Sequence, residues 1–285
     1  LLRLGEHQEL GLIIDGDGHF VEPSRIWAEY VDPKWRDRIF FAVERASQGA
    51  HASERGWPLG EPPKADDDVV ERFVVDDLET HLTSPQMPFT VADTMHPRGI
   101  LPGRSRRGHF SQCHPGSFSG QERLAVHDAE GIDAAVLFPT LGLFIGSVRD
   151  PQLAEAFARA VNRFAADYCA AAPRELYAVA TLPSQDPELA AKELRRCVEE
   201  HGFVAGWVRP NPTRQGHRTL DDPSLEVLWS TAVDLDVPIC IHSGTTGNEP
   251  TAGMDRAKSF LLAHAVAHPI EGMLAFGSLF QGRVF

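Results

Sequence analysis

Five short runs of apolar residues, rich in Val, Ile and Leu, recur along the chain and are separated by more polar sequence. Within each run the apolar residues are consecutive instead of alternating with polar ones, which is typical of strands buried on both faces of a parallel sheet. The pattern predicts parallel strands at residues 12–14, 134–138, 177–182, 204–208 and 237–241.

Segments with helical periodicity separate the last four predicted strands, at residues 151–171, 187–201 and 223–234. Each segment begins with a proline that directly follows an aspartate, an arrangement that suits the N-cap and the first turn of a helix. A further helical segment extends from residue 259 toward residue 285. Because strands that alternate with helices form right-handed βαβ units, the sequence predicts an α/β fold with a parallel sheet.

The stretch from about residue 32 to residue 121 interrupts this alternation. It is polar, rich in proline and glycine, and contains scattered aromatic residues. Connections inside a compact domain are usually far shorter than this stretch. We therefore expect an insertion after the first strand, within a single domain that spans residues 1–285.

Composition and charge narrow the classes of partner. Of the 285 residues, 42% are hydrophobic, which is enough for one large core. The net charge of −13 argues against binding to nucleic acid or to an anionic membrane surface, because both need clustered basic residues. The sequence shows neither the roughly 18 consecutive apolar residues of a membrane span nor a signal-peptide pattern. We therefore expect a small molecule as the partner.

The cysteines give information about the redox environment. No C-x-x-C spacing occurs among the four of them, which are Cys113, Cys169, Cys197 and Cys240. We expect reduced thiols that pack as small apolar side chains. Reduced thiols are typical of intracellular proteins, so the sequence predicts a cytoplasmic location.

The first predicted strand continues into the segment Asp-Gly-Asp-Gly-His at residues 15–19. Because side chains alternate along a strand, Asp17 and His19 should project to the same side. A carboxylate and an imidazole in this arrangement suit a divalent metal ion. The pair alone also fits a turn with a capping aspartate and a surface histidine.

A histidine also follows the fifth predicted strand, where His242 comes directly after an almost wholly apolar run. Barrel enzymes carry their catalytic groups at this carboxyl end of the strands. A buried histidine with a purely structural role is the alternative. Because two separate strand ends offer groups that bind metals, we predict a metal site formed by Asp17, His19 and His242.

Two polar residues follow the fourth predicted strand. The planar guanidinium of Arg209 matches a carboxylate in a bidentate manner, and Asn211 could add a hydrogen bond from the same edge. A structural salt bridge of Arg209 is the alternative. Glu22 and Trp27 follow the first motif, and we expect them to support the metal loop rather than to react.

Other histidines are weaker candidates. His96, inside the predicted insertion, could line a substrate pocket or be a loop residue without a special role. His264 and His268 are four residues apart on the last predicted helix, so they share one face. They could bind a metal together or reach the mouth of the site, with His268 as the candidate for substrate binding. Both could also be ordinary helix residues.

Several segments, in order along nearly the whole chain, resemble a known family. They are IIDGDGHFVEPSRIWAEYVDPKWRDR, RLAVHDAEGIDAAVLFPTLGL, GWVRPNP, VPICIHSGT and HPIEGMLAFGSLFQGRVF. The chain resembles the amidohydrolase-related family of the amidohydrolase superfamily, which includes aminocarboxymuconate-semialdehyde decarboxylase. The resemblance implies a (β/α)8 TIM barrel, and we expect the insertion to cover the mouth of its site. It also implies one divalent ion, zinc or manganese with iron as a further option, held by Asp17, His19 and His242.

The family places its last metal ligand, an aspartate, after an eighth strand, and the sequence shows five strands. Five strands cannot close an eight-stranded barrel, and an open half barrel exposes apolar edges. We expect the C-terminal part of the barrel to be missing from this sequence. An open sheet is the alternative.

Three functions fit these features. The first is a metal-dependent hydrolase of an ester, thioester, amide or C–C bond next to a carbonyl, acting on a small substrate with a carboxylate. The second is a metal-dependent non-oxidative decarboxylase of an aromatic or unsaturated acid. The third is a binding protein that keeps the barrel without the chemistry. By analogy with the family, we also expect a homo-oligomer.

Overall fold

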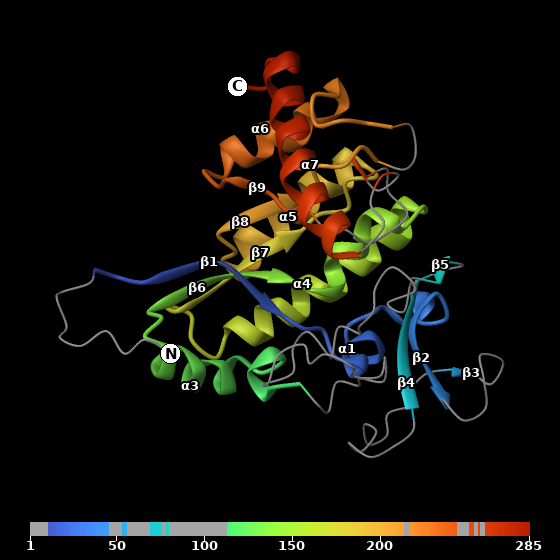
Figure 1. Cartoon of the computed structure of the whole chain (residues 1–285), viewed down its shortest axis with the longest axis vertical. Coiled ribbons are helices and arrows are strands. Elements are labelled where there is room, and N and C mark those ends of the chain that lie inside the picture. Colours follow the sequence, from blue (N-terminus) through green and yellow to red (C-terminus); the bar gives the residue numbers. More distant parts are fainter. Residues whose placement is uncertain are drawn as a thin grey trace.

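The computed structural model describes residues 11–45, 53–55, 69–75, 78–79, 113–213, 217–243, 251–253, 256 and 260–285. Its larger sheet has five parallel strands in the order β1-β6-β7-β8-β9 (Figure 1). Their bounds are Ile14–Phe20 (β1), Ala134–Pro139 (β6), Leu176–Thr181 (β7), Ala205–Val208 (β8) and Ile239–Ile241 (β9). Each strand is added at the same edge as the one before, as in a (β/α)8 barrel and unlike a doubly wound sheet. The larger sheet therefore forms a half barrel, which confirms the predicted fold class.

The first strand differs from its prediction at residues 12–14. Leu12 and Ile13 are exposed, and β1 begins at Ile14 and continues through the polar residues as far as Phe20. The backbone of this polar segment pairs with β6, and that pairing keeps it extended despite its two glycines. The other four predicted strands are confirmed, with ends that differ by one or two residues.

Several α-helices accompany the strands of this sheet (Figure 1). They are α3 (Gly120–Glu130), α4 (Pro151–Cys169), α5 (Pro187–His201) and α6 (Glu226–Asp234). The predicted caps are confirmed, because Asp150 accepts hydrogen bonds from the first turn of α4 and Asp186 from that of α5. Asp222 caps a short 3-10 helix, η6 (Pro223–Leu225), which precedes α6. Helix α3 was not among the sequence predictions.

The last predicted helix is present as α7, Phe260–Gly282, and it contains Pro269. Its ends lie close to the predicted residues 259 and 285. Within the described part of the chain, no helix is both long and apolar enough to cross a membrane.

The predicted insertion at residues 32–121 contains regular structure that the sequence reading missed. A second, antiparallel sheet has the order β3-β2-β4-β5 and lies near α1, Ser24–Glu29 (Figure 1). Its strands are Ile39–Arg45 (β2), Ser53–Arg55 (β3), Val69–Val75 (β4) and Leu78–Glu79 (β5). Ile39 and Val75 are buried in the main core, so the near end of this sheet packs against the half barrel. Short 3-10 helices also occur in this stretch at Pro33–Trp35 (η1) and Pro115–Ser117 (η4). A third, η5 at Leu141–Ser147, lies outside the insertion and follows β6.

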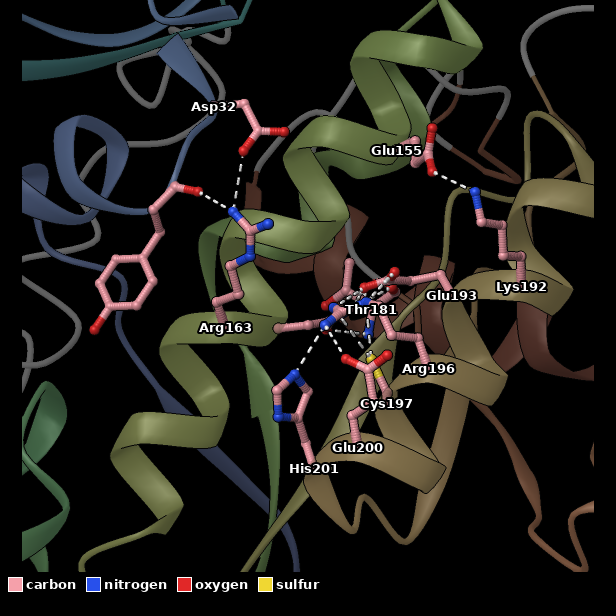
Figure 2. A network of polar contacts seen from close by, with 12 residues as sticks. Asp32, Glu155, Arg163, Thr181, Lys192, Glu193, Arg196, Cys197, Glu200 and His201 are labelled. Atoms are coloured by element: carbon pink, nitrogen blue, oxygen red, sulfur yellow. Dashed lines mark hydrogen bonds and ion pairs between the residues drawn. The ribbon is translucent and has the colours of Figure 1, made fainter.

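A buried polar network joins α4, β7 and α5 on the outer side of the sheet (Figure 2). Asn162 of α4 accepts a hydrogen bond from the Thr181 N–H at 2.8 Å and donates to the Thr181 carbonyl oxygen at 3.0 Å. It also donates to Glu193 Oε1 at 2.8 Å, and Glu193 pairs with Arg196 in the same helix. The network fixes the position of both helices on the strand that they cover.

Candidate metal centre

A β-bulge lies where the functional residues of β1 begin. The pairing of β1 with β6 shifts register between Asp15 and Gly18, where β1 uses one more residue than its partner. A bulge changes the direction in which neighbouring side chains point. Asp17 lies within the bulge and His19 beyond it, and the two residues occupy alternate positions of one strand, as the sequence predicts.

His242 directly follows β9, at the opposite edge of the sheet. Its backbone N–H donates to the carbonyl oxygen of Val208 at 3.0 Å, so hydrogen bonding between β8 and the chain continues past the end of β9. Strands β1 and β9 are the two outer strands of the sheet, yet the Nε2 atoms of His19 and His242 are only 3.1 Å apart. The curvature of the half barrel therefore brings its two edges together at the carboxyl end.

The carboxylate of Asp17 completes this cluster. Its Oδ1 atom is 3.3 Å from the Nε2 of His242 and 3.9 Å from the Nε2 of His19. One ligand-type atom from each of the three residues lies within 4.8 Å of the other two. In the part of the chain that the structure describes, no other group of three such residues has this spacing.

Hydrogen bonds on the far side of each imidazole determine which nitrogen carries the proton. His19 Nδ1 lies 2.9 Å from the carbonyl oxygen of Pro139, and His242 Nδ1 lies 2.8 Å from that of Ser243. A carbonyl oxygen only accepts, so both Nδ1 atoms donate and both Nε2 atoms of the neutral rings are acceptors. Two acceptors at 3.1 Å beside a carboxylate repel one another unless a cation lies among them. The three residues therefore fit a divalent metal ion.

The surroundings keep the imidazoles in the form that binds metals. Burial lowers the pKa of His19 and of His242, and in His19 the neighbouring ring lowers it further, while Asp17 opposes the change in both. Neutral imidazole is the ligand form. The rings of Phe138 and Trp207 lie 5.0 Å and 6.2 Å from the ring of His242, between centroids, and they give one side of the cluster an apolar wall. Asp17 is exposed, so the other side is open to solvent.

Glu22 is completely buried just beyond β1. Its carboxylate accepts hydrogen bonds of 3.1, 2.8 and 2.7 Å from three consecutive backbone N–H groups, those of Thr140, Leu141 and Gly142. Burial raises the pKa of Glu22 to about 7, and the N–H groups act in the opposite direction. These three residues directly follow Pro139, whose carbonyl oxygen orients the ring of His19. The contacts give Glu22 the geometry of the support that the sequence predicts.

Trp27 lies farther from the cluster than Glu22 along the chain and is also buried. Its ring stacks on that of Phe157 in α4, with centroids 5.2 Å apart and an angle of 18° between the planes. The stacking packs α1 against α4, so Trp27 contributes to the core beneath the loop after β1.

Arg209 and Asn211 follow β8 and are almost fully buried. The guanidinium of Arg209 donates to the carbonyl oxygen of Leu143 at 2.9 Å and to Asn211 Oδ1 at 3.2 Å. Arg209 directly follows Val208, whose carbonyl oxygen accepts the N–H of His242, so it lies near the cluster, and its charge contributes to the lowered pKa of His242. The structure thus holds Arg209 beside the candidate metal centre through protein contacts. Binding of a substrate carboxylate by Arg209 and Asn211 stays a prediction.

Of the remaining predicted histidines, the structure describes the side chain of His268 alone. His268 is half-buried in α7, and the group of ligand atoms does not include it. His96 lies outside the described residues, as does the side chain of His264. A role of His96 or His268 in substrate binding stays a prediction.

Two residues that contact His19, Pro139 and Arg123, were not predicted from the sequence. Pro139 acts through its carbonyl oxygen, and no sequence pattern marks a backbone acceptor. Arg123 of α3 donates to the carbonyl oxygen of His19 at 2.7 Å. An arginine in the segment before a buried strand is a weak signal, because most such residues are exposed.

Comparisons with known proteins agree with this architecture. The chain is similar to γ-resorcylate decarboxylase of Rhizobium radiobacter, with 34% identity over 169 residues, 58% of this chain and 48% of that protein. It is also similar to 2-amino-3-carboxymuconate-6-semialdehyde decarboxylase of Dictyostelium discoideum, with 29% identity over 62% of this chain and 46% of the relative. In both comparisons the matched region spans a little under half the length of the curated relative.

A solved structure shows the same fold over almost the whole chain. It is dihydroxybenzoic acid decarboxylase of Polaromonas sp. JS666 with bound manganese and the inhibitor 2-nitroresorcinol. The TM-score is 0.53 and the identity 19%, over 96% of this chain and 64% of that one. The model of the amidohydrolase family matches residues 14–271, which include the half barrel and the candidate metal centre. The chain belongs to the amidohydrolase family.

Proposed function

We propose that this chain belongs to a metal-dependent enzyme that removes a carboxyl group from a small hydroxylated aromatic acid as CO2, without oxidation. The observation that carries the proposal is the convergence of Asp17, His19 and His242 at the carboxyl end of the half barrel. The names of the relatives, γ-resorcylate decarboxylase and 2-amino-3-carboxymuconate-6-semialdehyde decarboxylase, favour decarboxylation over the hydrolysis that we placed first from sequence.

Manganese is the preferred ion. One carboxylate and two imidazoles suit manganese, zinc or iron, and the similar dihydroxybenzoic acid decarboxylase has bound manganese. His19 and His242 would hold the ion through their Nε2 atoms, and Asp17 through its carboxylate. When bound, the ion supplies a Lewis acid for the carboxylate of the acid and its neighbouring hydroxyl oxygen.

The residues around the ligands have separate tasks in this reaction. The carbonyl oxygens of Pro139 and Ser243 keep the two rings in the tautomer that presents Nε2. Phe138 and Trp207 give an aromatic substrate an apolar surface to pack against. Arg209 would bind the carboxylate, since its guanidinium carries charge and planar donors close to His242.

Decarboxylation balances without an oxidant or reductant. The bond between the ring carbon and the carboxyl carbon breaks, CO2 leaves, and the electron pair stays on the ring carbon. That carbon then takes a proton from a Brønsted acid, and the product is the phenol without its carboxyl group. A divalent ion held by Asp17, His19 and His242 would supply positive charge near the reacting ring.

Product analysis with γ-resorcylate as the probe tests the proposal. Protein supplied with Mn²⁺ should release one CO2 for each phenol formed, and EDTA should abolish the release. His242→Ala should abolish it as well, whereas His201→Ala, which changes an exposed histidine at the end of α5, should not. Absence of CO2 from γ-resorcylate and from related hydroxybenzoates, with Mn²⁺ bound, would contradict the proposal.

Hydrolysis would use the same three ligands, so the same experiment in water enriched in oxygen-18 distinguishes the two reactions. Label in the carboxyl group of a product formed from an ester or amide, without CO2, would favour the hydrolase. Bound Mn²⁺ without turnover of either class of substrate would favour a binding protein. The cytoplasmic location, the homo-oligomer and the covering role of the insertion stay predictions.

A further inference from the structure

Arg123 reaches from α3 to the back of the strand that carries two of the candidate ligands. Its Nη1 donates to the backbone carbonyl oxygen of His19 at 2.7 Å. The side chain is largely buried, with 16% of its surface exposed. An arginine at this position therefore contacts the backbone of a candidate metal ligand from the side opposite to the metal.

Gly18 leaves the space that this guanidinium occupies. A Cβ atom on Gly18 would lie 2.9 Å from Arg123 Nη2, 2.9 Å from Leu137 Cδ2 and 2.7 Å from Asp15 Oδ2. All three atoms are ends of side chains, so a Cβ atom on Gly18 would displace at least one of them. The bulge in β1 lies at the same place, and it brings the carboxylate of Asp15 and the position of Gly18 to one side of the strand.

Two further contacts fix the orientation of the guanidinium. Its Nε donates to His127 Nε2 at 3.0 Å, within α3, and its Nη2 lies 3.6 Å from Asp15 Oδ2. His127 is buried, so the contact is shielded from water. With its other nitrogens directed by His127 and Asp15, Arg123 presents Nη1 to His19 in a single geometry.

The ring of His19 is fixed by Pro139, and its backbone is fixed by Arg123. The position of the His19 Nε2 atom depends on the position of the His19 backbone. A shift of the strand would therefore move Nε2 relative to the metal. Groups behind the ligands of a metal typically contribute tenfold to one-hundredfold to metal affinity.

We propose that Arg123 is a positioning residue for the metal centre: its guanidinium, admitted by Gly18 and directed by Asp15 and His127, holds the backbone of His19 where the imidazole meets the metal. This inference rests on the metal site of the proposed function. It adds a residue from a helix that contributes no ligand and assigns a purpose to the second glycine of the Asp-Gly-Asp-Gly-His segment.

The test measures the dissociation constant of Mn²⁺ in the purified protein by calorimetry, well below the unfolding temperature of each variant. Arg123→Met should weaken binding by about tenfold to one-hundredfold. Arg123→Lys should recover part of the affinity, because an ammonium group can still donate to the carbonyl oxygen of His19. A purely structural role would lower the unfolding temperature and leave the Mn²⁺ affinity unchanged.

Arg163→Met is the matched control. Arg163 of α4 donates in the same manner to a backbone carbonyl, that of Tyr30 at 3.1 Å, and to a carboxylate, that of Asp32 at 3.2 Å (Figure 2). Neither acceptor belongs to a candidate ligand. Loss of Arg163 should therefore leave the affinity for Mn²⁺ within about twofold of the wild-type value. This is well below the loss of about tenfold or more that is typical of a group behind a metal ligand.

Gly18→Ala tests the same inference if Arg123→Met does not fold. The added methyl group should displace the guanidinium while the arginine remains, and binding of Mn²⁺ should weaken in the same direction. Wild-type affinity in a folded Arg123→Met variant, or in a Gly18→Ala variant whose structure shows the guanidinium displaced, would overturn the positioning role and leave the metal site standing. A wild-type protein that binds no Mn²⁺ would overturn both.

Discussion

Replacement of Glu22 by glutamine should change how stability depends on pH. Glu22 is completely buried, and burial raises the pKa of its carboxyl group from 4.5 to about 7. A group with a raised pKa in the folded state contributes stability that is full below pH 4.5 and is lost as the pH rises toward 7. Glutamine has nearly the same shape and does not titrate, so Glu22→Gln removes this contribution to the pH dependence.

The magnitude follows from the two pKa values. One pH unit corresponds to about 1.4 kcal/mol, so between pH 5 and pH 8 the wild-type protein should lose about 2.5 kcal/mol of unfolding free energy through Glu22. All other titrating groups are shared by the two proteins. The difference between their stability changes over this range therefore isolates the single carboxyl group.

Urea unfolding of the metal-free proteins at pH 5, 6, 7 and 8, with a common slope, is the assay. The wild-type midpoint should fall more steeply with rising pH than that of Glu22→Gln. Parallel curves would refute the reasoning. They would mean that the three N–H groups of Thr140, Leu141 and Gly142 stabilise the charged carboxylate well enough to offset its burial.

Three further substitutions have expected outcomes. Asn162→Ala leaves the buried N–H and carbonyl of Thr181 without their partner, so it should lower the unfolding free energy by about 3 kcal/mol in urea titrations. A loss below about 1 kcal/mol would show that the network is dispensable. Asp186→Ala removes the cap of α5 and should cost about 1 kcal/mol in the same assay; no change would mean that water replaces the cap. Cys240→Ser should remove most of the reaction with a thiol reagent, because Cys240 is partly exposed whereas Cys113, Cys169 and Cys197 are buried. An undiminished reaction would contradict that burial.

Most strands and helices of the half barrel were predictable because they have a local signal of their own, whereas α3 and the extent of β1 were missed. The run at residues 204–208 is apolar on both faces, and in the structure β8 is buried at every position. The aspartate before α5 and the proline that begins it predicted the first residue of that helix correctly. Such signals depend on neighbouring residues, so they can be read without knowledge of the partner elements.

The insertion shows where this reading fails. Strands β2 and β4 have strand-like apolar residues, such as Phe41 and Phe73, which lie opposite each other in the antiparallel pair. They lie within a long polar stretch of sequence. Their pairing joins two segments that are separated by residues without a helical or strand-like pattern of hydrophobic positions. The sequence gives no measure of that pairing, because register depends on contacts between distant segments.

The site was predictable as a set of residues and not as a geometry. Asp17, His19 and His242 could be named from strand ends, but the distance between their atoms depends on the curvature of the sheet. The groups that orient them are backbone carbonyls, a bulge and an arginine from α3, and these have no motif of their own.

The metal content of the purified protein tests the central claim most directly. After dialysis against Mn²⁺ and removal of free ion, elemental analysis should find one equivalent per chain in the wild-type protein and in His201→Ala. His19→Ala and His242→Ala should each lose nearly all of it while remaining folded. A folded wild-type protein without bound metal, or full metal content in both histidine variants, would contradict the claim that these side chains form a metal centre.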